Sequence, residues 1–347
     1  MEDSQTYNFT VNSSIKNYDV IFESIVNLKN RMNKGDIIIS SEFIHRNIIN
    51  NIDNKFIYVV DDKETTKEYS FANKLIIHLI DIGFKRNNKL IAIGGGVVQD
   101  LTGFVASMLY RGVEWNFYPT TLLSQGDSCI GSKTSINVGE YKNVVGNFYP
   151  PSKVIIDTQL LSSLPESQIK SGIGEMSHYF FIDGRKSFEY FKNNFKNPYY
   201  SEMIYRSLMI KKKMIEIDEF DQKERKVFNY GHTFGHAIES ITNYNIPHGV
   251  SVSYGMMISN FVSYKLGYIN KGEMEEMNEV LYQINGKNLP EFDFDYYISL
   301  LKKDKKNIGH NLGLVLTKGI GEMFLKQIDP NEDIISYIKE GLDICKK

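Results

Sequence analysis

The sequence predicts two domains, an α/β domain over residues 1–160 and an all-α domain over residues 161–347. A length of 347 residues suits two domains, and an apolar content of 42% is ample for their cores. Short β-rich runs alternate with helical stretches in the first half, whereas strand signals fade after about residue 160. The β-α-β order predicts a mainly parallel sheet covered by helices.

Short apolar runs in the first half have the length and β-branched content of buried strands. Apolar residues at 75–77 and 79–80 line one face of a predicted helix, and a further helix is expected after three glycines at 94–96. The predicted strands are 36–40, 56–60, 90–93, 115–118 and 154–156.

Helical patterns dominate the second half, where Glu166 after Pro165 suits a helix start. Residues 312–317 are expected to form a small strand or an extended return. Because no low-complexity linker separates the halves, we expect a ligand-binding cleft at the boundary near residue 160. The predicted helices are 169–181, 200–218, 231–242, 250–266 and 271–284.

Composition excludes several classes of protein. The formal charge of −2 gives no general attraction to nucleic acid or anionic membranes. Two cysteines, Cys129 and Cys345, are too few for a disulfide scaffold or a cysteine-rich zinc module. The N-terminus lacks the pattern of a signal peptide, and no apolar run is long enough to span a bilayer. We therefore expect a cytoplasmic protein that binds a small molecule.

The glycines at 94–96 stand between a predicted strand and a predicted helix. Such glycines let the backbone approach a diphosphate, and the helix start offers free N–H groups to an anion. A turn that merely needs a positive φ explains them equally well, because the G-x-G-x-x-G pattern is absent. Three polar residues downstream are either helix caps and strand ends or cofactor ligands: Asp100, Thr120 and Thr121.

Charged and amide side chains further along the chain stand beside glycines and apolar residues. Lysine and arginine next to backbone donors clamp phosphate or carboxylate groups. The alternative is an ordinary surface loop or, for Lys211, an exposed helix lysine. These residues are Asp127, Lys133, Lys142, Asn143, Lys211 and Arg225.

Three of the seven histidines suggest a metal site. His232 and His236 lie four residues apart in a predicted helix, which puts both imidazoles on one face. His248 follows a loop, and Glu175 supplies a carboxylate most simply. Two histidines and a glutamate with an open position describe a catalytic zinc site. The competing interpretation is a helix with two partly buried, hydrogen-bonded histidines.

Taken together, these segments resemble the 3-dehydroquinate synthase and sugar phosphate cyclase family. The resemblance extends from about residue 36 to about residue 322, and the segments follow one another at the family's spacing. Its most specific parts are residues 94–100, 110–112, 119–123, 127–143, 229–239 and 247–249.

The resemblance implies a Rossmann-like NAD-binding domain followed by a helical domain that holds zinc or cobalt. The implied metal ligands are Glu175, His232 and His248. The implied NAD site contains Glu64, Lys67, Gly95, Gly96, Asp100, Thr120, Thr121, Asp127 and Lys142. The implied substrate contacts are Arg111, Asp127, Asn143 and five residues that are also expected to be catalytic: Lys133, Lys211, Arg225, Asn229 and His236.

The implied activity converts 3-deoxy-D-arabino-heptulosonate 7-phosphate to 3-dehydroquinate and phosphate, in the shikimate pathway. NAD⁺ transiently oxidises a metal-held carbinol, phosphate is eliminated, the hydride returns, and an aldol step closes the carbocycle. The protein mainly orients the substrate, and His236 holds the phosphate or shuttles a proton. The family arginine that matches Arg111 reaches into the neighbouring subunit's site, which implies a homodimer.

The sequence also departs from the family pattern. His178 stands where the family has a lysine that contacts substrate hydroxyls, and Gly313 stands where it has an arginine or lysine. Gln99 replaces a glycine of the loop, and Ser41 replaces an aspartate that ends the first cofactor strand.

Three other functions stay open. His178 and Gly313 motivate a sister cyclase, for example one that acts on sedoheptulose 7-phosphate in secondary metabolism or glycan synthesis. A metal-dependent alcohol or glycerol dehydrogenase would share the two-domain layout, and a degenerate cyclase would serve as a binding or structural protein. Arg225 and Asn229 favour the branch of the family that uses the carboxylated substrate.

Overall fold

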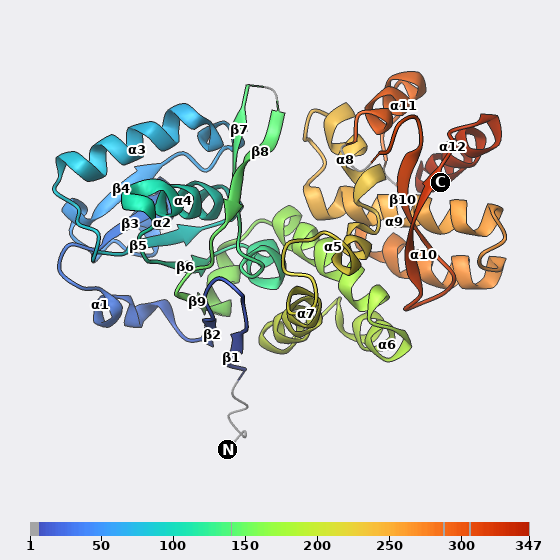
Figure 1. Ribbon diagram of the computed structural model, residues 1–347. Coiled ribbons are helices and arrows are strands. Elements are labelled where there is room, and N and C mark those ends of the chain that lie inside the picture. The colour runs from blue at the N-terminus through green and yellow to red at the C-terminus, as the bar shows by residue number, and fades with distance from the viewer. Residues whose placement is uncertain (1–6, 140, 287–288, 305–306, 347) are drawn as a thin grey trace, which may run out of the picture. The chain divides into compact units, whose positions relative to one another are not determined.

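The computed structural model describes residues 7–139, 141–286, 289–304 and 307–346 (Figure 1). The chain divides into two compact units. Unit 1 comprises Met1–Leu164 and Tyr200–Phe220, and unit 2 comprises Pro165–Tyr199 and Asp221–Lys347. Among the described residues, no helix combines the length and apolar character needed to cross a membrane.

A mainly parallel sheet forms the centre of unit 1, as predicted. In the described residues its strand order is β1-β2-β9-β6-β5-β3-β4, and β1 alone runs antiparallel to its neighbour. The five predicted strands are confirmed as β3, β4, β5, β6 and β9, whereas β1 and β2 were not predicted. The bounds are β1 Phe9–Val11, β2 Tyr18–Phe22, β3 Ile37–Ser41, β4 Ile57–Val60, β5 Leu90–Gly94, β6 Trp115–Pro119 and β9 Lys153–Ile156.

Helices cover this sheet, and every residue of β3, β5 and β6 is buried. Burial along the whole strand is typical of parallel sheets with covered faces. Ile38, Ile91 and Tyr118 pack with Leu28 and Ile44 from the helices beside them. The helices of this unit include α1 Leu28–Arg31, α2 Glu42–Asn47, α3 Tyr69–Asp81, α4 Gly96–Met108 and α7 Tyr200–Ile215.

An antiparallel ribbon, β7 (Lys133–Val138) with β8 (Tyr141–Phe148), also belongs to unit 1 (Figure 1). The alternative interpretation of Lys133, Lys142 and Asn143 as ordinary surface-loop residues is wrong, because all three lie in these strands. The residues of β8 before its last one are exposed, so no buried face produced a strand pattern in the sequence.

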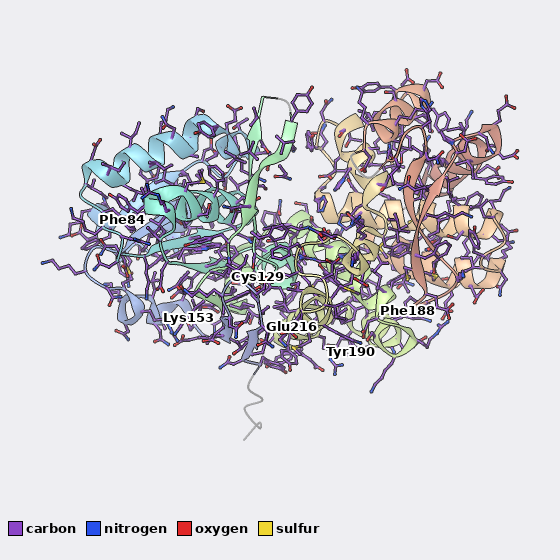
Figure 2. The ribbon with its side chains drawn as sticks, in the orientation of Figure 1. Phe84, Cys129, Lys153, Phe188, Tyr190 and Glu216 are labelled. Atoms are coloured by element: carbon purple, nitrogen blue, oxygen red, sulfur yellow. The ribbon has the colours of Figure 1, made fainter. Side chains whose placement is uncertain are left out.

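Helix α7 was predicted as a helix but was placed in the wrong domain. Ser207 Oγ donates to the backbone oxygen of Gly126 over 2.8 Å, which ties α7 to unit 1. Near the end of α7, Glu216, labelled in Figure 2, accepts a 2.9 Å hydrogen bond from the backbone N–H of Asn12. A single domain boundary at residue 160 therefore does not describe this segment. The apolar periodicity of a sequence predicts that a helix forms but not which elements it packs against.

Unit 2 is mainly helical, and α9 forms its centre, buried almost all round as a central helix must be. Helices α5, α8, α9 and α10 were predicted, whereas α6, α11 and α12 were not. The expected strand at 312–317 is β10, which pairs with β11, so this unit is not purely α-helical. The bounds are α5 Glu166–Ile182, α6 Arg185–Asn194, α8 His232–Ile241, α9 His248–Lys265, α10 Lys271–Asn285, α11 Phe294–Lys302, α12 Glu332–Lys346, β10 Leu312–Thr317 and β11 Met323–Ile328.

Candidate metal and cofactor sites

Glu175 of α5, His232 of α8 and His248 of α9 meet within unit 2, and their ligand atoms lie within 4.8 Å of one another. His232 Nε2 lies 3.5 Å from Glu175 Oε1, and His248 Nε2 lies 3.4 Å from Glu175 Oε2. Tetrahedral ligands about 2.0–2.1 Å from zinc stand about 3.3–3.5 Å apart. The residues present therefore fit a divalent metal, although their role as ligands stays a prediction.

The carboxylate of Glu175 supports this fit. It is only 3% exposed, and its Oε2 accepts no hydrogen bond from any described residue. Burial opposes its ionisation, but positive charge on His248 and His232, when these rings are protonated, outweighs burial and holds the pKa of Glu175 well below its ordinary value. A buried carboxylate oxygen without a hydrogen bond is costly, and a cation would satisfy it.

Glycines bring α5 and α9 close enough to form this group. A Cβ atom on Gly249 would lie 1.8 Å from the backbone oxygen of Ser171, and one on Gly174 would lie 2.3 Å from the backbone oxygen of Gly249. Only residues without a side chain permit such contact between backbones. Because Gly174 precedes Glu175 and Gly249 follows His248, this approach sets the two side chains beside each other.

Hydrogen bonds to the Nδ1 atoms assign the tautomers of both histidines. His232 Nδ1 lies 3.3 Å from the backbone oxygen of Tyr230, and His248 Nδ1 lies 2.9 Å from Glu239 Oε2. When the rings are neutral, as metal binding requires, both acceptors place the proton on Nδ1 and leave Nε2 with a lone pair for a cation. The Tyr230 hydroxyl in turn donates to Asn260 in the core of unit 2.

His236, although it shares a helix with His232, is not part of this trio. It is exposed, and its ring stacks 5.6 Å from the ring of His248. It forms a second group with Glu239 and His248, whose possible ligand atoms also lie within 4.8 Å of one another. His178 is buried beside the trio, with its ring 5.2 Å from that of His232 and its Nδ1 bonded to the backbone oxygen of Glu175.

The other predicted residues of unit 2 lie near the ends of their elements. Arg225 is buried in the short helix η7 (Glu224–Asn229), and Asn229 Nδ2 donates to the backbone oxygen of Lys226 over 3.1 Å. Gly313 lies in β10, where its carbonyl accepts a 3.1 Å hydrogen bond from Thr233 of α8. This hydrogen bond links the backbone of β10 at Gly313 to α8.

A polar cluster in unit 1 brings together several predicted cofactor and substrate residues. Lys67 Nζ lies 2.7 Å from Asp100 Oδ2 and 3.5 Å from Glu64 Oε1, and it donates to Asn143 Oδ1 over 2.6 Å. Ser135 of β7 donates to the same Asn143 oxygen over 2.8 Å. Asp100 lies within α4 and not at its start, so the alternative that it caps the helix is wrong.

Lys67 and Asp100 form an ion pair at neutral pH. Burial lowers the pKa of Lys67, but the carboxylates of Asp100 and Glu64 outweigh burial and raise that pKa above its ordinary value of 10.5. For Asp100, burial raises the pKa and the ammonium of Lys67 opposes the rise. We assign both charges, because the 2.7 Å contact and the second carboxylate favour the charged lysine.

The glycine loop packs tightly but needs no unusual backbone. None of Gly94, Gly95 and Gly96 has a positive φ, so the alternative of a turn that requires one is wrong. A Cβ on Gly95 would lie 3.1 Å from the Thr121 side chain, whereas one on Gly96 would meet open space at the start of α4. Thr120 donates its backbone N–H to the oxygen of Gly94 over 3.0 Å.

Asp127 is held by Lys211, whose Nζ lies 2.7 Å from Asp127 Oδ1 and donates to its backbone oxygen over 2.7 Å. Lys211 is buried, so its interpretation as an exposed helix lysine is wrong. Gln99 and Ser128 exchange two 2.6 Å hydrogen bonds and fix the next residue of this segment. Burial raises the pKa of the neighbouring Cys129 thiol, labelled in Figure 2, to about 12, so this thiol stays protonated.

Three predicted cationic residues of unit 1 are exposed: Arg111, Lys133 and Lys142. Arg111 lies in a turn where Tyr110, Arg111 and Gly112 have φ values of 51°, 63° and 113°. The sequence interpretation missed three polar residues that contact the candidate sites. They are Ser135, Asn137, which donates to Glu64 Oε1 over 2.9 Å, and Glu239.

Two family models match consecutive parts of the chain. The model for the N-terminal domain of 3-dehydroquinate synthase matches residues 57–171, and the model for its C-terminal domain matches residues 172–307. The chain belongs to the 3-dehydroquinate synthase family. The 3-dehydroquinate synthase of Dictyoglomus turgidum is 38% identical over 290 residues, which are 82% of each chain. These findings confirm the predicted family.

Two solved structures share this fold. A 2-deoxy-scyllo-inosose synthase, complexed with carbaglucose-6-phosphate, NAD⁺ and Co²⁺, is 25% identical with a TM-score of 0.86, covering 96% of this chain and 100% of that chain. The 2-epi-5-epi-valiolone synthase of Streptomyces hygroscopicus, with NAD⁺ and Zn²⁺ bound, is 19% identical with a TM-score of 0.82, covering 97% and 98%. The predicted fold class is confirmed.

Proposed function

We propose that this chain is an NAD- and metal-dependent cyclase that converts 3-deoxy-D-arabino-heptulosonate 7-phosphate to 3-dehydroquinate and phosphate. The observation that carries the proposal is the trio of Glu175, His232 and His248, whose spacing suits a divalent cation. The similarity to a curated 3-dehydroquinate synthase at 38% identity supports the choice of reaction.

Zinc or cobalt would be held by the trio, and NAD by residues of unit 1. When bound, the metal would polarise a substrate oxygen, and NAD would serve as a reversible hydride acceptor. Family members solved with NAD⁺ and Co²⁺ or Zn²⁺ support both assignments. The proposed NAD residues are Glu64, Lys67, Gly95, Gly96, Asp100, Thr120, Thr121, Asp127 and Lys142.

The charged residues of the chain would bind and orient the substrate. Arg225 would form an ion pair with the substrate carboxylate, since an arginine with little exposure is suited to bidentate recognition. His236, which is exposed, would hold the phosphate or move a proton near neutral pH. The remaining proposed contacts are Asp127, Lys133, Asn143, Lys211 and Asn229.

We also propose a homodimer in which Arg111 reaches the partner's site. The exposure of Arg111, which lies in a turn of three consecutive positive φ values, supports this role, because an exposed side chain is accessible to a partner. The proposal places the enzyme in the cytoplasm, where the free thiols of Cys129 and Cys345 stay reduced.

Phosphate release tests the reaction. The protein is incubated with the carboxylated heptulosonate phosphate, NAD⁺ and zinc or cobalt, and phosphate is followed together with absorbance of NADH. We expect stoichiometric phosphate and no accumulated NADH, because a cyclase returns the hydride to its substrate. No turnover, with NAD and metal bound, would reject this substrate, whereas accumulating NADH would favour a dehydrogenase.

A sister cyclase is the second candidate. His178, buried beside the trio, and Gly313, whose strand backbone contacts α8, differ from the residues that the family uses on its carboxylated substrate. Phosphate release from sedoheptulose 7-phosphate, with none from the carboxylated substrate, would decide for this alternative. A protein that binds neither NAD nor metal would instead be a degenerate cyclase.

A further inference from the structure

We propose that Glu239 is a positioning residue for His248. It holds the Nδ1–H group of this histidine, so that Nε2 faces Glu175, where the proposed trio would hold a cation. The inference rests on the proposed metal trio and adds to it a residue that contacts the cation only through His248.

The geometry of His248 carries the inference. Its Nδ1 lies 2.9 Å from Glu239 Oε2, within the usual range for an N–H···O hydrogen bond, and its Nε2 lies 3.4 Å from Glu175 Oε2. Nδ1 therefore faces the carboxylate of Glu239, and Nε2 faces the carboxylate of Glu175. A carboxylate on the far nitrogen fixes the tautomer, orients the ring and makes the near nitrogen a stronger ligand.

His248 depends on such a partner more than His232 does. The His232 side chain is 13% exposed and its Nδ1 bonds to the backbone oxygen of Tyr230, whereas the His248 side chain is 32% exposed. Packing confines His232, and its acceptor is main chain that no substitution removes. For the less confined His248, the hydrogen bond to Glu239 selects the ring orientation.

The same distance argues against a second metal site made of His236, Glu239 and His248. Ligands of one tetrahedral zinc ion stand about 3.3–3.5 Å apart. The 2.9 Å separation of His248 Nδ1 and Glu239 Oε2 is a hydrogen-bond length and places a proton between them. Glu239 therefore acts through the histidine instead of ligating a metal itself.

Metal affinity and the cobalt spectrum test the inference on the full chain. Apo wild type, Glu239→Ala and Glu239→Gln are titrated with Zn²⁺ against a competing chromophoric chelator, and their Co²⁺ complexes are recorded by visible absorption. We expect Glu239→Ala to lose roughly 10–100-fold in affinity. Glu239→Gln should lose less, because its amide oxygen can accept the same hydrogen bond. The Co²⁺ bands should change in Glu239→Ala and persist in Glu239→Gln.

Glu275→Ala, at an exposed glutamate of α10 that pairs with Lys271, is the matched control and should leave both readouts unchanged. Unchanged affinity and spectrum in Glu239→Ala would overturn the inference. The inference would also be overturned if wild type bound two metal ions and Glu239→Ala bound one, since Glu239 would then be a metal ligand. If the apo form of Glu239→Ala unfolds at a lower temperature than apo wild type, the metal affinity of Glu239→Gln is the deciding measurement. A 100-fold loss of affinity in Glu239→Gln would contradict the positioning role. Wild type that binds no metal would instead refute the proposed trio.

Discussion

Units 1 and 2 each bury a charged group among the candidate site residues. Only the group in unit 1 has close ion-pair and hydrogen-bond partners within the protein. In unit 1 the ammonium of Lys67 meets Asp100 at 2.7 Å and Asn143 at 2.6 Å. In unit 2 the imidazole nitrogens around Glu175 stand 3.4–3.5 Å away, and its Oε2 accepts no hydrogen bond in the described part of the chain.

The difference predicts how each candidate site would accommodate a ligand. A cofactor that binds at Lys67 must exchange existing hydrogen bonds for new ones, because the protein already neutralises this lysine. A cation at Glu175 would complete contacts that are otherwise unmade. We therefore expect metal binding to stabilise unit 2 strongly, and substitutions in the two units to have effects of different kinds.

His232→Ala should have the largest effect. It removes one ligand, so bound metal should fall by more than the roughly 10–100-fold that outer partners contribute, and activity should be abolished. The fold should survive, since the side chain is partly exposed. Metal content, phosphate release and thermal unfolding measure the effects on metal binding, activity and the fold, respectively. His310→Ala, at an exposed histidine of the same unit, should change none of them. Full metal content in His232→Ala would show that the trio is not a metal site.

Arg225→Ala tests whether unit 2 also recognises a carboxylate. We expect a loss of roughly 2–5 kcal/mol in transition-state binding, measured as kcat/KM for the carboxylated substrate, because Arg225 is buried and its ion pair would be desolvated. Arg185→Ala, which removes an exposed pair with Glu276, should leave the rate unchanged. An unchanged rate in Arg225→Ala would mean that the carboxylate assignment is wrong.

The sequence predicted those parts of the fold whose apolar pattern is strong. Buried strands such as β3 and β5 stand out because every residue is apolar or small. The ribbon of β7 and β8 was missed, since β8 is exposed almost throughout and has no alternating pattern. The neighbours of α7 were also missed, because Ser207 and Lys211 contact unit 1 through hydrogen bonds that periodicity does not encode.

The candidate trio was predicted better than its surroundings. The spacing of His232 and His236 placed both on one face, but only His232 joins Glu175, because α9 brings His248 to the remaining position. Glu239 gave no signal of its own, since a glutamate in a helix is usually a solvated side chain. Its contact with His248 depends on how α8 and α9 pack, which Gly235 and Gly255 permit at backbone distance.

Lys67→Met tests how much the ion pair between Lys67 and Asp100 stabilises unit 1. Removing one partner leaves Asp100 without its ammonium, and such losses cost about 3–5 kcal/mol when both groups are buried. The Asp100 side chain is 20% exposed, so we expect the lower end, about 3 kcal/mol in free energy of unfolding. Lys63→Met, at an exposed lysine nearby, should change stability by less than about 0.5 kcal/mol. Equal stabilities of the two variants in denaturant titrations would refute the ion pair.

The smallest effect should appear at alkaline pH. The pKa of Lys67 in the folded chain lies above 10.5, because Asp100 and Glu64 favour the ammonium against burial. A raised lysine pKa stabilises the folded state fully below the unfolded-state value and loses this effect as the pH rises through the folded-state value. The stability difference between wild type and Lys67→Met should therefore be constant from neutral pH to about pH 10 and narrow above 10.5. Urea titrations of both proteins across this pH range measure the stability difference. Other lysines and tyrosines that titrate in this range affect both proteins equally, so their contributions cancel in the difference. A gap that widens with pH would mean that Lys67 is neutral in the folded protein, and the contrast between the two units would fail.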